Sequence, residues 1–125
     1  MTTEKLHEEL TKVIDFLDAG DPDTALKLLD SYLKHTDDDA DAYFYRGDAL
    51  AEQGRLHEAI SAYRTGLNYT PDNPDALTTL GDLLFEAGQH QEALEQYRAV
   101  LLVDPEDADA LVSIGLVHND LDQAD

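Results

Sequence analysis

The chain has no cysteine, and none of its segments is a long hydrophobic run. Without cysteine, disulfides, thiolate metal sites and a cysteine nucleophile are all excluded. In the first thirty residues, charged residues are interspersed among Leu6, Leu10, Val13, Ile14 and Leu17, as in an amphipathic helix. No segment approaches the roughly 18 apolar residues of a membrane span, and no signal peptide is predicted. We therefore expect a soluble, cytoplasmic protein.

Basic residues are scarce: eight Lys and Arg face 28 Asp and Glu, which gives a net charge of −20. A surface this negative repels phosphate backbones and anionic lipid headgroups, so neither nucleic acid nor a membrane is a predicted partner. The hydrophobic fraction of 42% is too high for a disordered acidic tail. The 125 residues are enough for one folded domain.

Patterns that carry chemistry are also missing. The acidic run that follows His35 lacks the glycine and the terminal glutamate of a calcium loop. The five histidines form no HExxH motif and no pair four residues apart. No nucleophile motif surrounds Ser31, Ser61 or Ser113, and there is no glycine-rich phosphate loop. The sequence predicts no metal, no cofactor and no enzyme activity.

What the chain does have is an internal repeat with a period of 34 residues. Repeats of this length are typical of stacked helical units. The columns that keep the period are Gly20, Gly54 and Gly88; Ala25, Ala59 and Ala93; Gly47, Gly81 and Gly115; Pro71 and Pro105; and Tyr63-Arg64 with Tyr97-Arg98.

These columns have direct physical interpretations. Gly54 and Gly88 stand where the first helix of each pair must end. Gly47 and Gly81 fall inside a helix, where glycine costs about 1 kcal/mol relative to alanine. That cost indicates close contact with a neighbouring helix, because a side chain at these positions would hold the neighbour away.

The spacing predicts seven helices and no strand. Thr3 is the predicted N-cap of the first helix and Asp21 that of the second, with Pro22 at its first position. The predicted ranges are about 4–18, 22–35, 40–53, 56–69, 74–87, 90–103 and 108–121. The predicted fold class is therefore all-α.

The repeat resembles the tetratricopeptide repeat family. That family has an aromatic residue, Leu-Gly, Tyr, Ala, Phe and Pro at fixed offsets. The central unit carries Tyr43, Arg46-Gly47, Leu50, Ala59, Tyr63 and Pro71, and the next carries Leu77, Leu80-Gly81, Leu84, Ala93, Tyr97 and Pro105. Arg46 departs from the pattern by replacing a leucine, and Leu50 and Leu84 depart by replacing a tyrosine.

The resemblance implies a right-handed α-solenoid of antiparallel helix pairs. It consists of three repeats and one terminal helix, forming a single domain over residues 1–125. The expected units are about 6–39, 40–73, 74–107 and a partial unit 108–125.

In this family the first helix of each pair lines a concave groove that binds a protein or peptide. The resemblance places in it His7, Leu10, Ile14, Asp41, Phe44, Tyr45, Asp48, Asp75, Thr78, Asp82, Phe85, Glu86, Asp109, Val112 and Leu116. For Phe44, Tyr45 and Phe85 a position between helices is an equal alternative.

Some family members bind a C-terminal carboxylate through groove lysines and asparagines. Here the matching positions hold Phe44, Asp48, Thr78 and Asp82, so this function is not carried over. An acidic, aromatic groove instead suits a basic or mixed basic and apolar segment.

The acidic coat has two explanations, a cationic partner or adaptation to concentrated salt. The net charges of residues 1–39, 40–73, 74–107 and 108–125 are −7, −2, −7 and −4. Because the charge is spread along the chain, salt adaptation is the favoured explanation.

The last helix is predicted to be apolar around much of its circumference, with Leu111, Val112, Ile114, Leu116 and Val117. We expect either a chain excised from a longer repeat protein, which is favoured, or an exposed C-terminal edge that pairs with a partner or with itself. A monomer is predicted.

The leading functional hypothesis is a non-enzymatic protein–protein interaction scaffold. The alternatives are a purely structural segment of a longer repeat protein, and an accessory domain of a larger enzyme or sensor.

Overall fold

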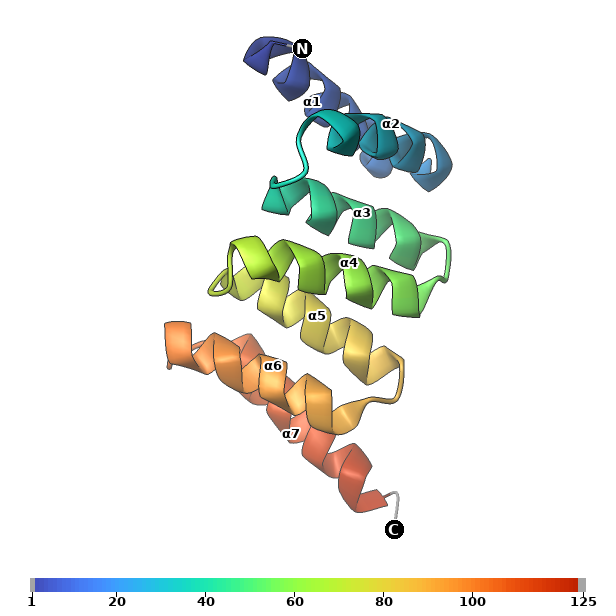
Figure 1. The fold of residues 1–125 in the computed structure, drawn as a ribbon. Coiled ribbons are helices and arrows are strands. Elements are labelled where there is room, and N and C mark those ends of the chain that lie inside the picture. Colours follow the sequence, from blue (N-terminus) through green and yellow to red (C-terminus); the bar gives the residue numbers. More distant parts are fainter. Residues whose placement is uncertain (1, 124–125) are drawn as a thin grey trace. The chain divides into compact units, whose positions relative to one another are not determined.

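The computed structural model describes residues 2–123, which form seven α-helices and no strand (Figure 1). The helices are α1 (Thr3–Asp18), α2 (Pro22–His35), α3 (Ala40–Glu52), α4 (Leu56–Tyr69), α5 (Pro74–Glu86), α6 (His90–Val103) and α7 (Ala108–Gln123). The predicted all-α class is confirmed, and each predicted helix is present. One cap differs: Thr2, not Thr3, caps α1 by accepting a hydrogen bond from the Lys5 amide at 3.2 Å.

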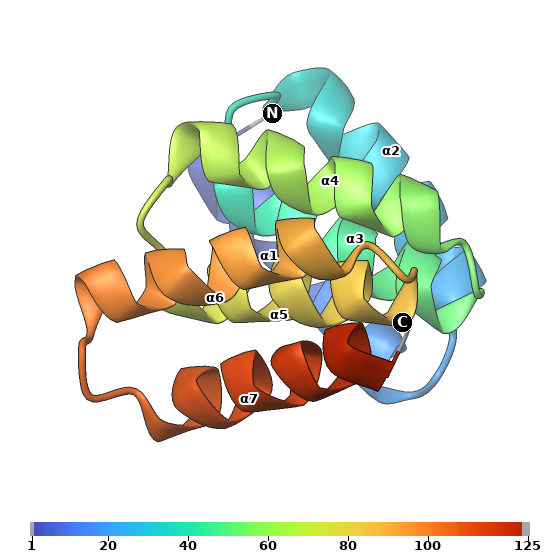
Figure 2. The same ribbon diagram turned by 90° about the horizontal axis from the view of Figure 1, so that it is seen from below.

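The chain divides into two compact units, Met1–Tyr69 with α1 to α4 and Thr70–Asp125 with α5 to α7. In the first unit α1 packs on α2, α2 on α3, and α3 on α4. In the second unit α5 packs on α6, and α6 packs on α7 (Figure 2). The antiparallel helix pairs are thus present in both units. A single continuous domain over residues 1–125 stays a prediction.

The helix pairs begin and end on the residues that the repeat marks. Asp21 accepts a hydrogen bond from the Thr24 amide at 3.2 Å at the start of α2, and Asn73 accepts one from the Ala76 amide at 3.1 Å at the start of α5. The turns after α3 and α5 contain Gly54 and Gly88 with φ of 77° and 81°. Glycine adopts this left-handed conformation without the strain that a Cβ would cause.

The two units repeat one packing motif between the helices of a pair. A Cβ built on Gly47 would overlap the ring of Tyr63, and one on Gly81 would lie 2.6 Å from Cε1 of Tyr97. Both tyrosines are buried. The predicted close contact at these two glycines is therefore confirmed, and the aromatic ring of the second helix fills the space that a side chain would occupy.

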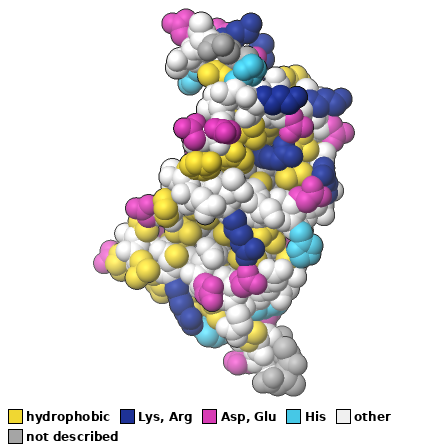
Figure 3. All heavy atoms as spheres, in the orientation of Figure 1, with side chains coloured by type: hydrophobic (Ala, Val, Ile, Leu, Met, Phe, Trp, Pro, Cys, Tyr) yellow, Lys and Arg dark blue, Asp and Glu magenta, His cyan; other side chains and the backbone are white. Residues whose placement is uncertain are grey.

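The core of each unit is apolar. In the first unit Val13, Ala25, Leu29, Tyr32 and Ala42 form one buried cluster. Within the described residues no charged or polar side chain is buried. The charged side chains are therefore exposed or half-buried, and acidic ones are scattered over the face shown in Figure 3. No helix in residues 2–123 combines the length and the apolar character needed to cross a membrane.

Candidate functional site

Two adjoining cavities lie along α1 and α3 in the first unit. The larger, about 480 Å³, is lined by Thr3, Leu6, His7, Leu10, Thr11, Ile14, Tyr32, Thr36, Asp39, Asp41 and Tyr45. The smaller, about 390 Å³, is lined by Ile14, Leu17, Asp18, Tyr45, Asp48, Ala51 and Glu52. Because Ile14 and Tyr45 line both, the cavities form one continuous depression, here named the α1–α3 groove.

Helical spacing explains why these residues meet. On α3, Asp41, Tyr45, Asp48 and Glu52 follow one another at intervals of four, three and four residues, which places them on one face. On α1, the half-buried Leu6, Leu10, Ile14 and Leu17 follow one another at intervals of four, four and three residues, which also places them on one face. The groove thus combines an apolar α1 wall with an acidic and aromatic α3 wall.

The charged lining of the groove is almost entirely negative. Apart from His7 and two tyrosines, the ionisable side chains that line it are the carboxylates Asp18, Asp39, Asp41, Asp48 and Glu52, with no lysine or arginine. Burial, followed by the charges of the nearby carboxylates, raises the pKa of the Tyr45 hydroxyl. Such a lining attracts cationic groups and repels anionic ones.

Two of these carboxylates are held by tyrosines. The Tyr32 hydroxyl donates to Asp39 Oδ2 at 2.5 Å, while Asp39 Oδ1 accepts from the Asp41 amide at 3.0 Å and so caps α3. The Tyr63 hydroxyl donates to Asp48 Oδ1. Burial raises the pKa of Asp48, and the Tyr63 hydrogen bond opposes that shift. These bonds fix the positions of the two carboxylates before any ligand arrives.

Phe44 lies elsewhere. It is buried, its ring stacks on Tyr63 with centroids 5.2 Å apart, and a Cβ on Gly66 would overlap it. Of the two positions considered for Phe44, the structure has the one between helices α3 and α4. Tyr45, the next residue, lines the groove.

In the second unit, Asp82 and Phe85 line a smaller cavity of about 100 Å³ together with Tyr97, Ser113 and Leu116. The Tyr97 hydroxyl donates to Asp82 Oδ1 at 2.5 Å, which repeats the Tyr63–Asp48 bond.

The remaining candidates of this unit make fewer contacts. The ring of Phe85 also lies against His90, with centroids 5.0 Å apart. Asp75 is exposed, and the half-buried Thr78 donates its hydroxyl to the Pro74 carbonyl at 2.9 Å. The structure thus brings together Asp41, Tyr45 and Asp48 in one unit, and Asp82 and Phe85 in the other.

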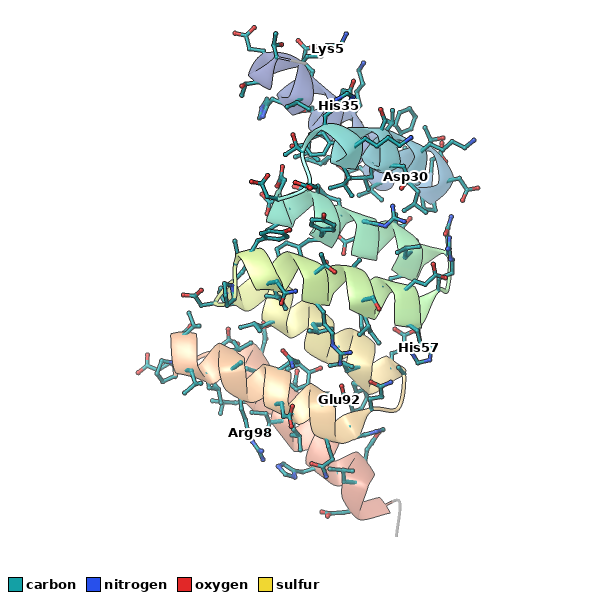
Figure 4. The ribbon with its side chains drawn as sticks, in the orientation of Figure 1. Lys5, Asp30, His35, His57, Glu92 and Arg98 are labelled. Atoms are coloured by element: carbon teal, nitrogen blue, oxygen red, sulfur yellow. The ribbon has the colours of Figure 1, made fainter. Side chains whose placement is uncertain are left out.

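A further cavity, about 410 Å³, opens between α2, α3 and α4 and was not predicted from the sequence. It is lined by Leu33, Tyr43, Arg46, Leu50, His57, Glu58, Ser61, Ala62 and Thr65. Arg46, which stands where the repeat pattern has leucine, forms an ion pair with Asp30 (Figure 4 labels Asp30 on α2 and His57 at the start of α4). The departure of Arg46 from the pattern was the available signal. Because this cavity mixes both signs of charge, it lacks the uniform character of the α1–α3 groove.

No group of three or more His, Cys, Asp or Glu side chains in the described part of the chain is arranged to hold a metal ion. In the acidic run, the Asp37 carbonyl accepts the Tyr43 hydroxyl at 2.7 Å and Asp39 caps a helix. Asp37 and Asp39 therefore have structural roles.

Solved structures share the fold. The crystal structure of MamA has a TM-score of 0.86 and 25% identity, over 91% of this chain and 67% of that one. The first tetratricopeptide domain of Spaghetti (RPAP3) bound to the HSP90 peptide SRMEEVD has a TM-score of 0.88 and 16% identity, over 97% and 96%. The Yersinia enterocolitica type III secretion chaperone SycD with a peptide of the translocator YopD has a TM-score of 0.86 and 13% identity, over 95% and 96%.

Sequence comparison points the same way. A search of curated protein sequences gives no match. Two family models, each described as tetratricopeptide repeat, match residues 10–77 and 50–113, and each covers more than half of the chain. They overlap across the Gly54 turn and together include both complete glycine–tyrosine contacts. The chain belongs to the tetratricopeptide repeat family.

Proposed function

We propose that this protein is a protein-interaction module whose α1–α3 groove binds a segment carrying basic and apolar side chains. The observation that carries the proposal is the lining of the groove. Five carboxylates surround Tyr45 and an apolar wall, with no arginine or lysine among the lining residues. A cationic side chain has several carboxylate acceptors there, whereas an anionic side chain has no lysine or arginine to pair with.

Structures of the same fold support peptide binding as the mode of action. The Spaghetti domain is bound to the HSP90 peptide SRMEEVD, and the SycD chaperone to a YopD peptide. Their low identity to this chain makes the likeness one of fold, so the ligand preference must come from the groove itself. Because the groove of this chain is acidic, we propose a basic partner segment in place of an acidic one such as SRMEEVD.

Three contacts would provide recognition. A lysine or arginine side chain would pair with the exposed Asp41 or the half-buried Asp48. The ring of Tyr45 would offer its face to the same cation. Apolar side chains of the ligand would cover Leu10 and Ile14, which line the opposite wall.

The test uses two fluorescently labelled peptides of equal length, one alternating Lys and Leu and the other alternating Glu and Leu. We expect the protein to bind only the Lys/Leu peptide. The double variant Asp41→Asn with Asp48→Asn should weaken binding by about tenfold, which corresponds to about 1.4 kcal/mol. Tyr45→Ala should weaken it by a similar factor.

The matched control neutralises two exposed acids outside the groove, Asp72→Asn with Glu95→Gln. It changes the net charge by the same amount and should leave binding nearly unchanged. If the control weakens binding as much as the groove variant does, attraction is general and the groove is not the site. If neither peptide binds, the alternatives of a structural segment or an accessory domain are favoured.

The acidic surface as a whole has a separate explanation. We propose that it keeps the protein folded and dispersed in concentrated salt, since every charged side chain in the described part of the chain is outside the core. Residues 2–123 offer no arrangement on which to propose a catalytic role.

A further inference from the structure

Three helices among the described residues carry the same stripe of residues, and in two of them a neighbouring helix covers it. In α3 the stripe is Tyr43, Gly47 and Leu50, and α4 covers it. In α5 it is Leu77, Gly81 and Leu84, and α6 covers it. In each case the ring of a tyrosine from the covering helix lies on the glycine. The matching positions in α7 are Leu111, Gly115 and His118.

In α7 this stripe is open to solvent. Leu111 is 53% exposed, and a Cβ built on Gly115 would meet no atom within 4 Å. The helix is attached to its own unit through another face, on which Ala110 and Val117 are fully buried. Figure 2 shows α7 (red) with α5 and α6 on one side only. The exposed Val112 and Leu116 widen the apolar surface, at 63% and 56%.

Leu111, Gly115 and His118, together with Asp122 one turn later, are here named the α7 stripe. We propose that the α7 stripe binds a helix of a partner protein and that this helix lies antiparallel to α7. The occupant carries a small residue, an aromatic residue four positions later and a basic residue directly after it. The chain supplies two templates for that pattern, Ala59–Tyr63–Arg64 on α4 and Ala93–Tyr97–Arg98 on α6. In both, the alanine is fully buried and the aromatic ring covers a glycine.

Charge complementarity indicates a basic partner and not a second copy of this chain. Residues 70–123 carry twelve acidic side chains and one basic side chain, Arg98. Asp122 lies on the stripe itself, because it follows Leu111 by three helical turns. Two copies meeting through α7 would bring two strongly negative units together, whereas a basic helix would be attracted to the same surface.

This site is distinct from the α1–α3 groove, which lies in the other unit. The proposal does not rest on the function assigned to that groove. A negative result at either surface leaves the other unaffected.

The probe is a synthetic peptide with the sequence of residues 55–70, RLHEAISAYRTGLNYT, which contains the α4 template and two arginines against one glutamate. Binding is followed by fluorescence anisotropy, and the site is located by NMR chemical shifts. We expect saturable binding with shifts at Leu111, Gly115 and His118. A peptide in which Tyr63 is alanine should bind at least about tenfold more weakly, since it lacks the ring that covers the glycine. A peptide of residues 89–104, which has three acidic residues and one arginine, should also bind more weakly.

The protein variant that tests the site is Gly115→Leu. Because the space beside Gly115 is open, the variant should fold with an unchanged or higher melting temperature. The leucine would hold a docking helix away, so peptide affinity should fall by at least about tenfold. Asp109→Leu is the matched control: it adds the same side chain to an exposed position on the opposite side of α7 and should leave binding intact.

Three results would overturn the proposal. One is peptide binding at α7, followed by the chemical shifts of Leu111 and His118, that survives Gly115→Leu. Another is a set of chemical shifts confined to α3, which would mean that the peptide displaces α4. The third is a dimer of the protein alone in sedimentation that Gly115→Leu abolishes, because the occupant would then be a second copy.

Discussion

The α3–α4 and α5–α6 pairs share one set of contacts and differ in another. In both pairs a buried tyrosine of the second helix lies over a glycine of the first helix. The tyrosine hydroxyl donates a hydrogen bond to the aspartate that comes directly after that glycine. In the first pair the buried Phe44 lies over Gly66, whereas the matching positions of the second pair hold Thr78 and the fully buried Val100. The first pair thus sets a phenylalanine against a glycine, and the second pair sets a threonine against a valine. The volume between two helices is therefore set by the facing pair and not by either residue alone.

The largest effect should come from disrupting the contact of Phe44 with Gly66 in the first pair. Gly66→Val forces a side chain into the Phe44 ring and should cost about 1–3 kcal/mol of unfolding free energy. Phe44→Thr leaves a cavity and should cost about 2–4 kcal/mol. The double variant reproduces the second pair, so its loss should be smaller than the sum by at least about 1 kcal/mol. Urea denaturation of the four proteins measures this coupling. Strict additivity would show that the two positions do not share a space.

A second difference between the two units is their charge. Residues 1–69 carry seven basic side chains against fifteen acidic ones, and residues 70–125 carry one against thirteen. If the acidic coat is an adaptation to salt, molar KCl should raise the melting temperature, because repulsion is screened when the Debye length falls to about 3 Å. Amide hydrogen exchange should slow more in α5 to α7, by about tenfold, than in α1 to α4. A melting temperature that stays flat with KCl would contradict the adaptation.

The smallest expected effect concerns the two aspartates that accept tyrosine hydroxyls. Asp48 is half-buried and Asp82 is exposed. Burial raises the pKa of Asp48 in the folded state, so ionisation of Asp48 lowers stability as pH rises through the range between its unfolded and folded pKa values. Asp48→Asn keeps an acceptor for Tyr63 and removes this penalty.

Above that pH range Asp48→Asn should therefore be neutral or stabilising by up to about 1 kcal/mol, and below it the gain should vanish. Asp82→Asn should change stability less. Thermal melts of both variants across acidic and neutral pH provide the measurement. A gain for Asp48→Asn that is present only at low pH would reverse the sign of the argument.

The helices were predictable because every turn of this fold is marked in the sequence. The glycines after α3 and α5 and the proline at the start of α5 set those boundaries, and the repeat copied them from unit to unit. The tyrosine–glycine contacts were predictable in part, since a glycine inside a helix needs a compensating neighbour. The identity of that neighbour required the register of the facing helix.

Part of the groove lining was predictable from the sequence. The resemblance to the family placed Asp41, Tyr45 and Asp48 of α3 in the groove, and His7, Leu10 and Ile14 of α1 with them, and all six line it. Phe44 was ambiguous because its direction depends on Gly66, which is 22 positions later and on another helix.

The contributions of Asp18 and Asp39 to the groove were missed for a related reason. Asp18 is the last residue of α1, and Asp39 precedes α3 as its cap, so both stand at the ends of the helical pattern. Where a helix end points depends on the turn that follows or precedes it. The repeat pattern of the central units does not fix that direction for the more degenerate first unit.

The hydrogen bond from Tyr63 to Asp48 has a consequence for anyone who would re-engineer this groove. Replacing Asp48 with lysine, to make the groove accept acidic peptides, would also remove the acceptor of the Tyr63 hydroxyl and set an ammonium beside it. The same ring fills the space over Gly47, so the disturbance would reach the contact that joins α3 to α4. Specificity and folding are coupled at this residue. A redesign of ligand charge should start at Asp41, whose exposed carboxylate has no such neighbour in the core.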